Sequence, residues 1–266
     1  QFLGSQSVSR WADSHCHLAD PRPGFDPDRV IAEATRAGVS RFLQGGIHPE
    51  DWKRQFELAA RYPGRVFCAC GLHPCWVGGT AGEVELREAL GSLPEELARP
   101  EVRGLGELGL DGRPQYIGRM SLQETVFREQ LRIANSKNIP IILHVVREHA
   151  RAIQILREEG IPKRGGLVHS FSGGAQEAKR YVELGLHLSV SGGNFRSDAR
   201  RVTESAAKVP AESWLVETDS PDQKHPEWSG QWSEPAQLLD VARRLGVVLG
   251  KKTEAILTES GDRLER

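Results

Sequence analysis

Eight short apolar segments recur along this chain roughly 25–35 residues apart, and the stretches between them carry helical spacing of apolar residues. Regular alternation of this kind indicates parallel strands joined by crossover helices. Eight such units in 266 residues match the size of a (β/α)8 TIM barrel. We therefore predict an α/β fold consisting of a single (β/α)8 barrel, with a doubly wound open sheet as the alternative.

The element boundaries follow from apolar runs and helix-ending glycines. Ile141, Ile142 and Leu143 form a continuous apolar run, as expected for a strand that is covered on both faces. Gly38, Gly160 and Gly185 each close a helical pattern. Strands are predicted near 11–17, 39–46, 66–72, 102–109, 139–145, 166–170, 186–191 and 213–218. Helices are predicted over 26–37, 50–61, 83–98, 119–137, 148–159, 174–184, 197–208, 234–246 and 251–259.

Composition excludes several classes of protein. The chain has 38% hydrophobic residues, and 35 Lys and Arg against 36 Asp and Glu give a formal charge of −1. It is therefore too apolar and too balanced in charge to be disordered. No stretch approaches the ~20 apolar residues of a membrane span, so no membrane association is expected. We assign residues 1–10 to an N-terminal tail and residues 11–266 to the barrel domain.

The four cysteines indicate a reducing compartment. Cys16, Cys68, Cys70 and Cys75 contain no Cys-x-x-Cys pair, which argues against a zinc knuckle or a thioredoxin-type motif. Cys68 and Cys70 lie in an apolar run and are predicted to be buried thiols. We expect a cytoplasmic, monomeric protein.

Polar side chains gather at the predicted carboxyl ends of the strands, where barrels carry their chemistry. Six of the nine histidines lie there, and His15 and His17, two residues apart on one strand, point the same way. A lone strand-end histidine is usually structural, and a lone aspartate is often a helix cap. Here, however, several imidazoles and two carboxylates would meet at one end of the barrel, and it is this combination that indicates a metal site. That combination suits zinc, manganese or iron, and accepts magnesium.

At this point the sequence resembles the TatD-type metal-dependent deoxyribonucleases, a family of amidohydrolase-like barrels. The resemblance runs from Asp13 to about Leu264 and rests on six motifs in the family order. These are Asp13-Ser14-His15-Cys16-His17-Leu18, Gly71-Leu72-His73-Pro74, Gly106-Glu107-Leu108-Gly109-Leu110-Asp111, Pro140-Ile141-Ile142-Leu143-His144, His169-Ser170-Phe171-Ser172-Gly173 and Glu217-Thr218-Asp219-Ser220-Pro221.

The resemblance implies two or three divalent metal ions (Mg, Mn or Zn) at the carboxyl ends of the strands. His15 and His17 would bind one ion, His144 and His169 a second, and Glu107 would bridge the two. Asp219 would contact the first ion and the attacking water, so Glu107 and Asp219 are the predicted catalytic residues. His73 would face the substrate phosphate and would not be a primary ligand.

Three positions depart from the family pattern. An arginine usually stands two residues after the strand-5 histidine, where this chain has Val146 followed by Arg147. Ser233 and Ser260 stand where the family has asparagines. These changes leave the predicted ligands in place and affect the expected substrate contacts.

We expect a DNA or oligonucleotide substrate that is cleaved at single-stranded ends. Substrate contacts are predicted for His73, Arg147, Phe171 and Ser172. Exposed loop aromatics would stack on unpaired bases, or would cover the barrel end. Further candidates are Trp76, Phe195, Trp228 and Trp232 for stacking, and Arg196 and Lys224 for phosphate contacts.

The predicted reaction is exonucleolytic hydrolysis of a phosphodiester by a metal-bound hydroxide. No Gly-x-Ser-x-Gly nucleophile elbow occurs in the sequence. One alternative is a metal-dependent amidohydrolase, lactonase or phosphoesterase that acts on a small molecule. Glu107 argues against it, because related amidases often resemble one another in having a carboxylated lysine at that position. A non-catalytic, metal-stabilised scaffold is the other alternative.

Overall fold

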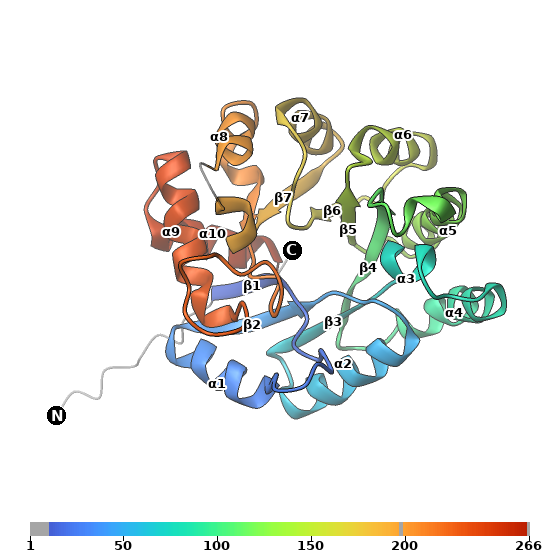
Figure 1. Ribbon diagram of the computed structural model, residues 1–266, viewed down its shortest axis with the longest axis horizontal. Helices are drawn as coiled ribbons and strands as arrows, with labels where there is room; N and C mark the ends of the chain where they lie inside the picture. Colours follow the sequence, from blue (N-terminus) through green and yellow to red (C-terminus); the bar gives the residue numbers. More distant parts are fainter. Residues whose placement is uncertain (1–10, 197–198, 265–266) are drawn as a thin grey trace.

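Eight parallel strands surround a central axis in the computed structural model, and the helices form a ring outside them (Figure 1). The structure describes residues 11–196 and 199–264, so the predicted tail at residues 1–10 lies outside the described residues. Each strand pairs in parallel with the next one along the chain. The strands are β1 (Trp11–Cys16), β2 (Val39–Gln44), β3 (Val66–Cys70), β4 (Val102–Asp111), β5 (Ile141–Val146), β6 (Gly166–Val168), β7 (Leu186–Val190) and β8 (Trp214–Val216).

This strand order confirms the barrel and excludes the doubly wound sheet, in which the order would reverse at a switch point. Hydrogen bonds join the first and last strands across the remaining gap. The Ser14 hydroxyl donates to the Val216 carbonyl at 2.9 Å, and the Asp219 amide donates to the His15 carbonyl at 3.0 Å.

Helices follow the strands as predicted, with small shifts at their ends. Gly38, Gly160 and Gly185 all have positive φ angles, which confirms their expected place at helix ends. The predictions miss the short helix α3, and α10 extends beyond the predicted segment. The helices are α1 (Pro27–Arg36), α2 (Pro49–Arg61), α3 (Pro74–Gly78), α4 (Glu83–Glu96), α5 (Met120–Lys137), α6 (His149–Glu159), α7 (Ala175–Glu183), α8 (Arg200–Ala206), α9 (Leu238–Leu249) and α10 (Thr253–Leu264).

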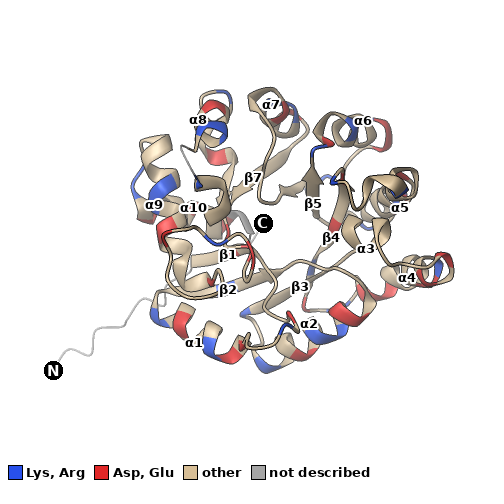
Figure 2. Ribbon diagram, in the orientation of Figure 1, with Lys and Arg blue, Asp and Glu red and all other residues tan. Residues whose placement is uncertain are grey.

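The core has two parts, because the strands alternate between two faces. Ile141 and Leu143 face the helices in the large outer core, whereas Ile142 belongs to a small inner cluster with Leu167 and Leu215. Cys16, Cys68 and Cys70 are buried free thiols, as predicted for the latter two. In Figure 2, the positions of basic and acidic residues are interspersed along the outer helices, in keeping with the balanced charge.

Candidate metal centre

The predicted ligands converge at the carboxyl end of the barrel, here called the barrel mouth. His15 lies near the end of β1, Glu107 in β4 and His144 in β5, while His169 follows β6 directly and Asp219 lies three residues after the end of β8. His15 and His17 flank Cys16 and turn their Nε2 atoms toward one another, 3.3 Å apart. The parallel strands therefore bring together side chains that are up to 204 positions apart, namely those of His15 and Asp219.

Glu107 lies at the centre of this arrangement, and its two oxygens face different imidazoles. Oε1 lies 3.1 Å from His17 Nε2 and 3.5 Å from His15 Nε2. Oε2 lies 2.7 Å from His169 Nε2 and 3.4 Å from His144 Nδ1. The carboxylate thus divides the centre into a His15–His17 half and a His144–His169 half.

Asp219 completes the first half. Its Oδ1 lies 3.6 Å from His15 Nε2 and 3.5 Å from His17 Nε2. The residue has φ of 51°, in the left-handed region that non-glycine residues seldom adopt. The hydrogen bond that its backbone N–H donates to the His15 carbonyl holds that conformation, so the backbone between β8 and β1 directs the carboxylate into the centre.

These residues fit divalent cations. Both oxygens of Glu107 are buried, and neither accepts a hydrogen bond from the residues that the structure describes. A buried carboxylate in that state is costly unless a cation or a donor compensates it. The backbone of Gly45 forms one wall of the centre, because an added Cβ would lie 2.3 Å from His15 Cε1 and 2.8 Å from Glu107 Oε1. Imidazole and carboxylate together are ligands for zinc and manganese.

Protonation states in the cation-free protein reflect the same charge arrangement. Burial alone would raise the pKa of Glu107, but the nearby imidazoles, His169 foremost, hold it well below its usual value. Burial would lower the pKa of His17 and His169, yet Glu107 raises the pKa of His17 to about 9 and that of His169 to about 10. Protons on these rings therefore compensate the buried carboxylate at neutral pH.

Two carboxylates that the sequence reasoning did not single out support the ligand histidines from behind. Asp111 Oδ2 lies 3.0 Å from His144 Nε2, and the Arg113 Nε donates to Asp111 Oδ1 at 2.9 Å. Glu217 Oε1 lies 3.6 Å from His169 Nδ1 and accepts the Ser170 amide at 2.7 Å. Carboxylates in such positions orient metal-binding imidazoles and raise their basicity. Both residues lie in the family motifs, Asp111 in the one with Glu107 and Glu217 in the one with Asp219, and this is the sequence signal that could have identified them.

His73 differs from the other histidines of the centre in its hydrogen bonding. Its Nδ1 accepts the Cys75 amide at 2.9 Å, so the neutral ring carries its proton on Nε2. That nitrogen faces Glu107 Oε2 at 3.4 Å. A protonated Nε2 donates a hydrogen bond and does not ligate a cation, which supports the predicted role of His73 beside the ions.

Two predicted stacking residues are wrong. The rings of Phe171 and Phe195 are only 2% and 4% exposed, so neither can stack on a base. The Phe171 ring packs edge-on against Tyr181 and Trp214, because the chain after β6 turns back into the core. The rings of Trp76, Trp228 and Trp232 are half-buried around the barrel mouth.

The remaining predicted substrate residues differ in availability. Arg147 is exposed, with φ of 65°, and its guanidinium makes no hydrogen bond or ion pair within the described chain. Ser172 is half-buried, and its hydroxyl lies 3.1 Å from His149 Nε2. The Arg196 guanidinium donates to the Lys224 carbonyl at 3.1 Å.

The two unusual serines form hydrogen bonds to the last strand and to the segment directly after it. The Ser233 hydroxyl donates to the Thr218 carbonyl at 2.9 Å, and the Ser260 hydroxyl accepts the Val216 amide at 3.2 Å. Both hold β8 and its following loop, next to Asp219, so these departures concern the support of the centre and not its ligands.

The sequence profile described as "TatD related DNase" matches residues 12–262. The chain belongs to this family. It is 33% identical over 233 residues to the uncharacterized metal-dependent hydrolase YjjV of Escherichia coli K12, covering 86% of each chain. It is 30% identical over 262 residues to a Salmonella typhimurium protein named 3'-5' ssDNA/RNA exonuclease TatD, covering 94% of this chain and 96% of that protein.

Solved structures give the same result. The crystal structure of YjjV matches with a TM-score of 0.85 at 31% identity, over 96% of each chain. A mutant organophosphorus hydrolase from Deinococcus radiodurans matches with a TM-score of 0.65 at 13% identity, over 96% of this chain and 92% of that one, a likeness of fold alone. The prediction of a metal-dependent hydrolase of the TatD family is therefore confirmed. None of the helices among the described residues is long and apolar enough to cross a membrane.

Proposed function

We propose that this TatD-family hydrolase is a two-cation deoxyribonuclease that removes nucleotides from single-stranded DNA ends. The observation that carries this proposal is the position of Glu107, whose two buried oxygens face separate pairs of imidazoles. Two-metal sites stabilise the attacking and leaving oxygens of a phosphoryl displacement, with ions about 3.5–4 Å apart.

The two halves of the centre supply the ligands. His15, His17 and Asp219 would hold one ion, His144 and His169 the other, and Glu107 would contact both. Magnesium, manganese or zinc would each suit this ligand set. When bound, such ions supply a water of lowered pKa and stabilise charge on the phosphoryl group.

The chain's own residues supply proton transfer and positioning. The Asp219 carboxylate projects into the centre from the end of β8 and would accept the proton of the attacking water as general base. The Nε2–H of His73 would donate a hydrogen bond to a nonbridging phosphate oxygen. Arg147, whose guanidinium is free within the described chain, would make the second phosphate contact from the loop after β5.

Two observations bear on the choice of nucleic acid. The Salmonella relative is named for 3'-5' digestion of single-stranded DNA and RNA. The outer helices carry interspersed charges of both signs, unlike the basic surface that duplex binding requires (Figure 2). We infer that a strand end enters the barrel mouth and that long duplex does not bind.

The cellular setting belongs to the same proposal. Cys16, Cys68, Cys70 and Cys75 are all free thiols in the structure. Free thiols in this number are typical of a reducing compartment, so we infer a cytoplasmic enzyme.

The test is a nuclease assay after removal of metal by a chelator and return of Mg²⁺, Mn²⁺ or Zn²⁺. A single-stranded oligonucleotide labelled at its 5' end should shorten progressively from the 3' end with at least one of these ions, and a duplex of the same sequence should resist. No hydrolysis with any ion would contradict the proposal. Faster turnover of cyclic amides or lactones than of DNA would favour the small-molecule alternative.

A further inference from the structure

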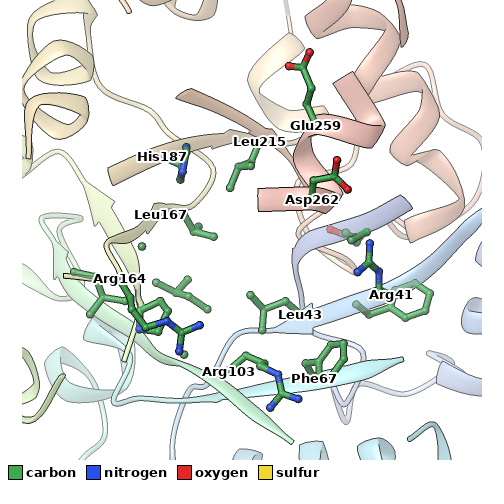
Figure 3. Close-up of a pocket in the computed structure, with 18 of the residues that line it drawn as sticks. Arg41, Leu43, Phe67, Arg103, Arg164, Leu167, His187, Leu215, Glu259 and Asp262 are labelled. Atoms are coloured by element: carbon green, nitrogen blue, oxygen red, sulfur yellow. The ribbon is translucent and has the colours of Figure 1, made fainter. Parts of the chain in front are cut away.

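A pocket lies at the amino end of the barrel (Figure 3), and its lining includes none of the candidate metal ligands. It has a volume of about 860 Å³, within the range of roughly 300–1,000 Å³ for small-molecule sites. Strand β4 shows the separation, because Arg103 near its start lines this pocket while Glu107 lies in the metal centre. The proposed nuclease reaction uses none of the residues discussed below.

The pocket exists because small residues occupy the lowest layer of the barrel interior. Barrels usually fill this region with branched side chains. Here Ala12, Gly104 and Gly166 line it instead. Glycine is required at position 166, since a Cβ there would lie 2.0 Å from the Ile141 carbonyl oxygen, and a Cβ at Gly104 would be a tight contact, 3.3 Å from the Pro140 carbonyl oxygen. The close strand approach thus leaves space on the barrel axis.

The inner wall of the pocket is apolar. Leu43, Ile142, Leu167 and Leu215 come from four different strands and form the small inner core cluster together with Ala69. In Figure 3 the labelled leucines lie between Arg103 and Arg164 on one side and the acidic Glu259 and Asp262 on the other, whereas Arg41 lies beside Asp262. An apolar body of a ligand would therefore be desolvated against these side chains.

The rim of the pocket carries fixed charge. Arg41, Arg103 and Arg164 line it from β2, β4 and the segment before β6. The Arg103 guanidinium lies 4.7 Å from the centre of the Phe67 ring, which orients it. Its Nη1 donates to the Val102 carbonyl at 3.2 Å, whereas its Nε and Nη2 make no hydrogen bond within the described chain.

Four acidic residues, Asp13, Glu212, Glu259 and Asp262, also line the pocket, and Asp262 lies beside Arg41 (Figure 3). Glu259 forms an ion pair with Lys251 at 2.8 Å, and Glu212 and Asp262 are exposed. Arg103 and Arg164 therefore define the side of the pocket that would receive an anion, because a guanidinium presents a planar fork of donors to an anionic group.

We propose that this pocket is a second ligand site, which binds a small organic anion with an apolar body. The anionic group would lie against Arg103 and Arg164, and the apolar body against Leu167 and Leu215. Either a carboxylate or a phosphate would satisfy the arginines, and the two are separated by experiment.

The probe is 8-anilinonaphthalene-1-sulfonate, an anion with an aromatic body whose fluorescence rises on transfer to an apolar site. Titration of the folded wild-type protein should give one saturable site. Charge reversal in Arg103→Glu and in Arg164→Glu should each raise Kd about tenfold, the effect of losing one charge-assisted contact. Arg157→Glu on the exposed face of α6 is the matched control and should leave Kd unchanged. Thermal melting of each variant verifies its fold.

Competition then separates the two anionic groups. Phenyl phosphate or phenylacetate should displace the dye, and the better competitor identifies the preferred group. Loading the metal centre should leave dye binding unchanged, because the two sites lie at opposite ends of the barrel. The proposal would be overturned by any of three results: an unchanged Kd in both charge-reversal variants, no displacement of the dye by either competitor, or loss of dye binding when metal is added.

Discussion

Burial of the charged Glu107 carboxylate is energetically unfavourable, and in the cation-free protein protonated histidines compensate its charge. Its carboxylate is fully buried at the centre of the barrel mouth, and the rings of His17 and His169 are the nearest compensating charges. Removing one member of such a buried set leaves an uncompensated charge, which destabilises by about 3–5 kcal/mol. Cations and protons therefore compete for one group of side chains.

Cation affinity should consequently depend on pH. Although burial alone would lower both values, Glu107 holds the pKa of His17 at about 9 and that of His169 at about 10, so both rings carry protons at pH 7. A divalent ion must displace those protons, and its apparent affinity should rise as the pH rises from 6 to 9. Calorimetry in two buffers of different ionisation enthalpy should show proton release on binding.

A histidine outside the centre provides the control for this pH dependence. Burial lowers the pKa of His149 to about 4, so its ring is neutral at pH 7. His149→Gln should release the same number of protons as the wild type. An affinity that does not change between pH 6 and 9 would contradict the displacement of protons.

The assigned role of Asp219 predicts a separation of binding from turnover. Asp219→Asn preserves the shape of the side chain but removes its capacity to accept a proton. Turnover should fall by about 10²–10⁴-fold while metal is still bound. Steady-state hydrolysis and metal content by mass spectrometry measure the two effects.

Asp222 is a matched control for Asp219. It lies three residues further along, is exposed, and forms an ion pair with Arg22 at 2.9 Å. Asp222→Asn should retain wild-type turnover. Equal activity of the Asp219→Asn variant and the wild type would exclude Asp219 as the general base.

At the scale of elements, Gly45 shows how the backbone after β2 shapes the centre. Its Cα lies so close to His15 and Glu107 that a methyl group has no space. Gly45→Ala should lower metal stoichiometry and cost about 1–3 kcal/mol of stability through overpacking. Metal content and urea unfolding measure these changes.

Gly91 is the corresponding control, since a Cβ there meets nothing within 4 Å and the residue lies inside α4. Gly91→Ala should bind metal normally and gain stability by up to about 1 kcal/mol. A Gly45→Ala protein with full metal content would contradict this prediction, because it would show that the backbone at Gly45 can shift without disturbing metal binding.

Ser260 predicts a different result, because it acts on the fold and not on the ligands. Its hydroxyl accepts the Val216 amide of β8, and Ser260→Ala would leave that buried N–H unpaired. The expected loss is about 1–3 kcal/mol in urea unfolding, with metal content unchanged. Ser136→Ala on the exposed side of α5 should change stability by less than about 0.5 kcal/mol. Loss of metal in Ser260→Ala without loss of stability would contradict this assignment.

The elements also show which features sequence patterns can predict. All eight strands were predicted, because a strand covered on both faces gives an apolar run that contrasts with the helices around it. Strands β6 and β8 end earlier than predicted, since Ser170 and Asp219 have positive φ angles that turn the chain into the barrel mouth. Helix α3 was missed because its five residues are too few to show a helical period.

Side-chain direction explains most of the differences at the site. The convergence of the candidate ligand histidines was predictable because strand ends in a barrel converge, whichever way each ring points. The positions of Asp111 and Glu217 behind His144 and His169 depend on ring orientation, which the sequence does not encode locally. Phe171 appeared exposed because it follows a strand, whereas the turn at Ser170 directs it into the core.

At the scale of the whole molecule, a formal charge of −1 differs from the positive charge of proteins that hold nucleic acid by electrostatics alone. Six candidate imidazole and carboxylate ligands lie together at the barrel mouth and would bind cations there. The outer helices, by contrast, carry residues of both charges (Figure 2). Attraction for phosphate would then be local and dependent on the bound ions. The amino end of the same barrel remains available for the second ligand site.

The most direct test of the two-cation account is an anomalous difference map from crystals grown with Mn²⁺ or Zn²⁺. Two peaks should flank the Glu107 carboxylate, one beside His15, His17 and Asp219 and the other beside His144 and His169. The same map from Glu107→Gln crystals should lose at least one peak. A single peak that leaves one oxygen of Glu107 without a cation, in a wild-type crystal saturated with metal, would contradict the account.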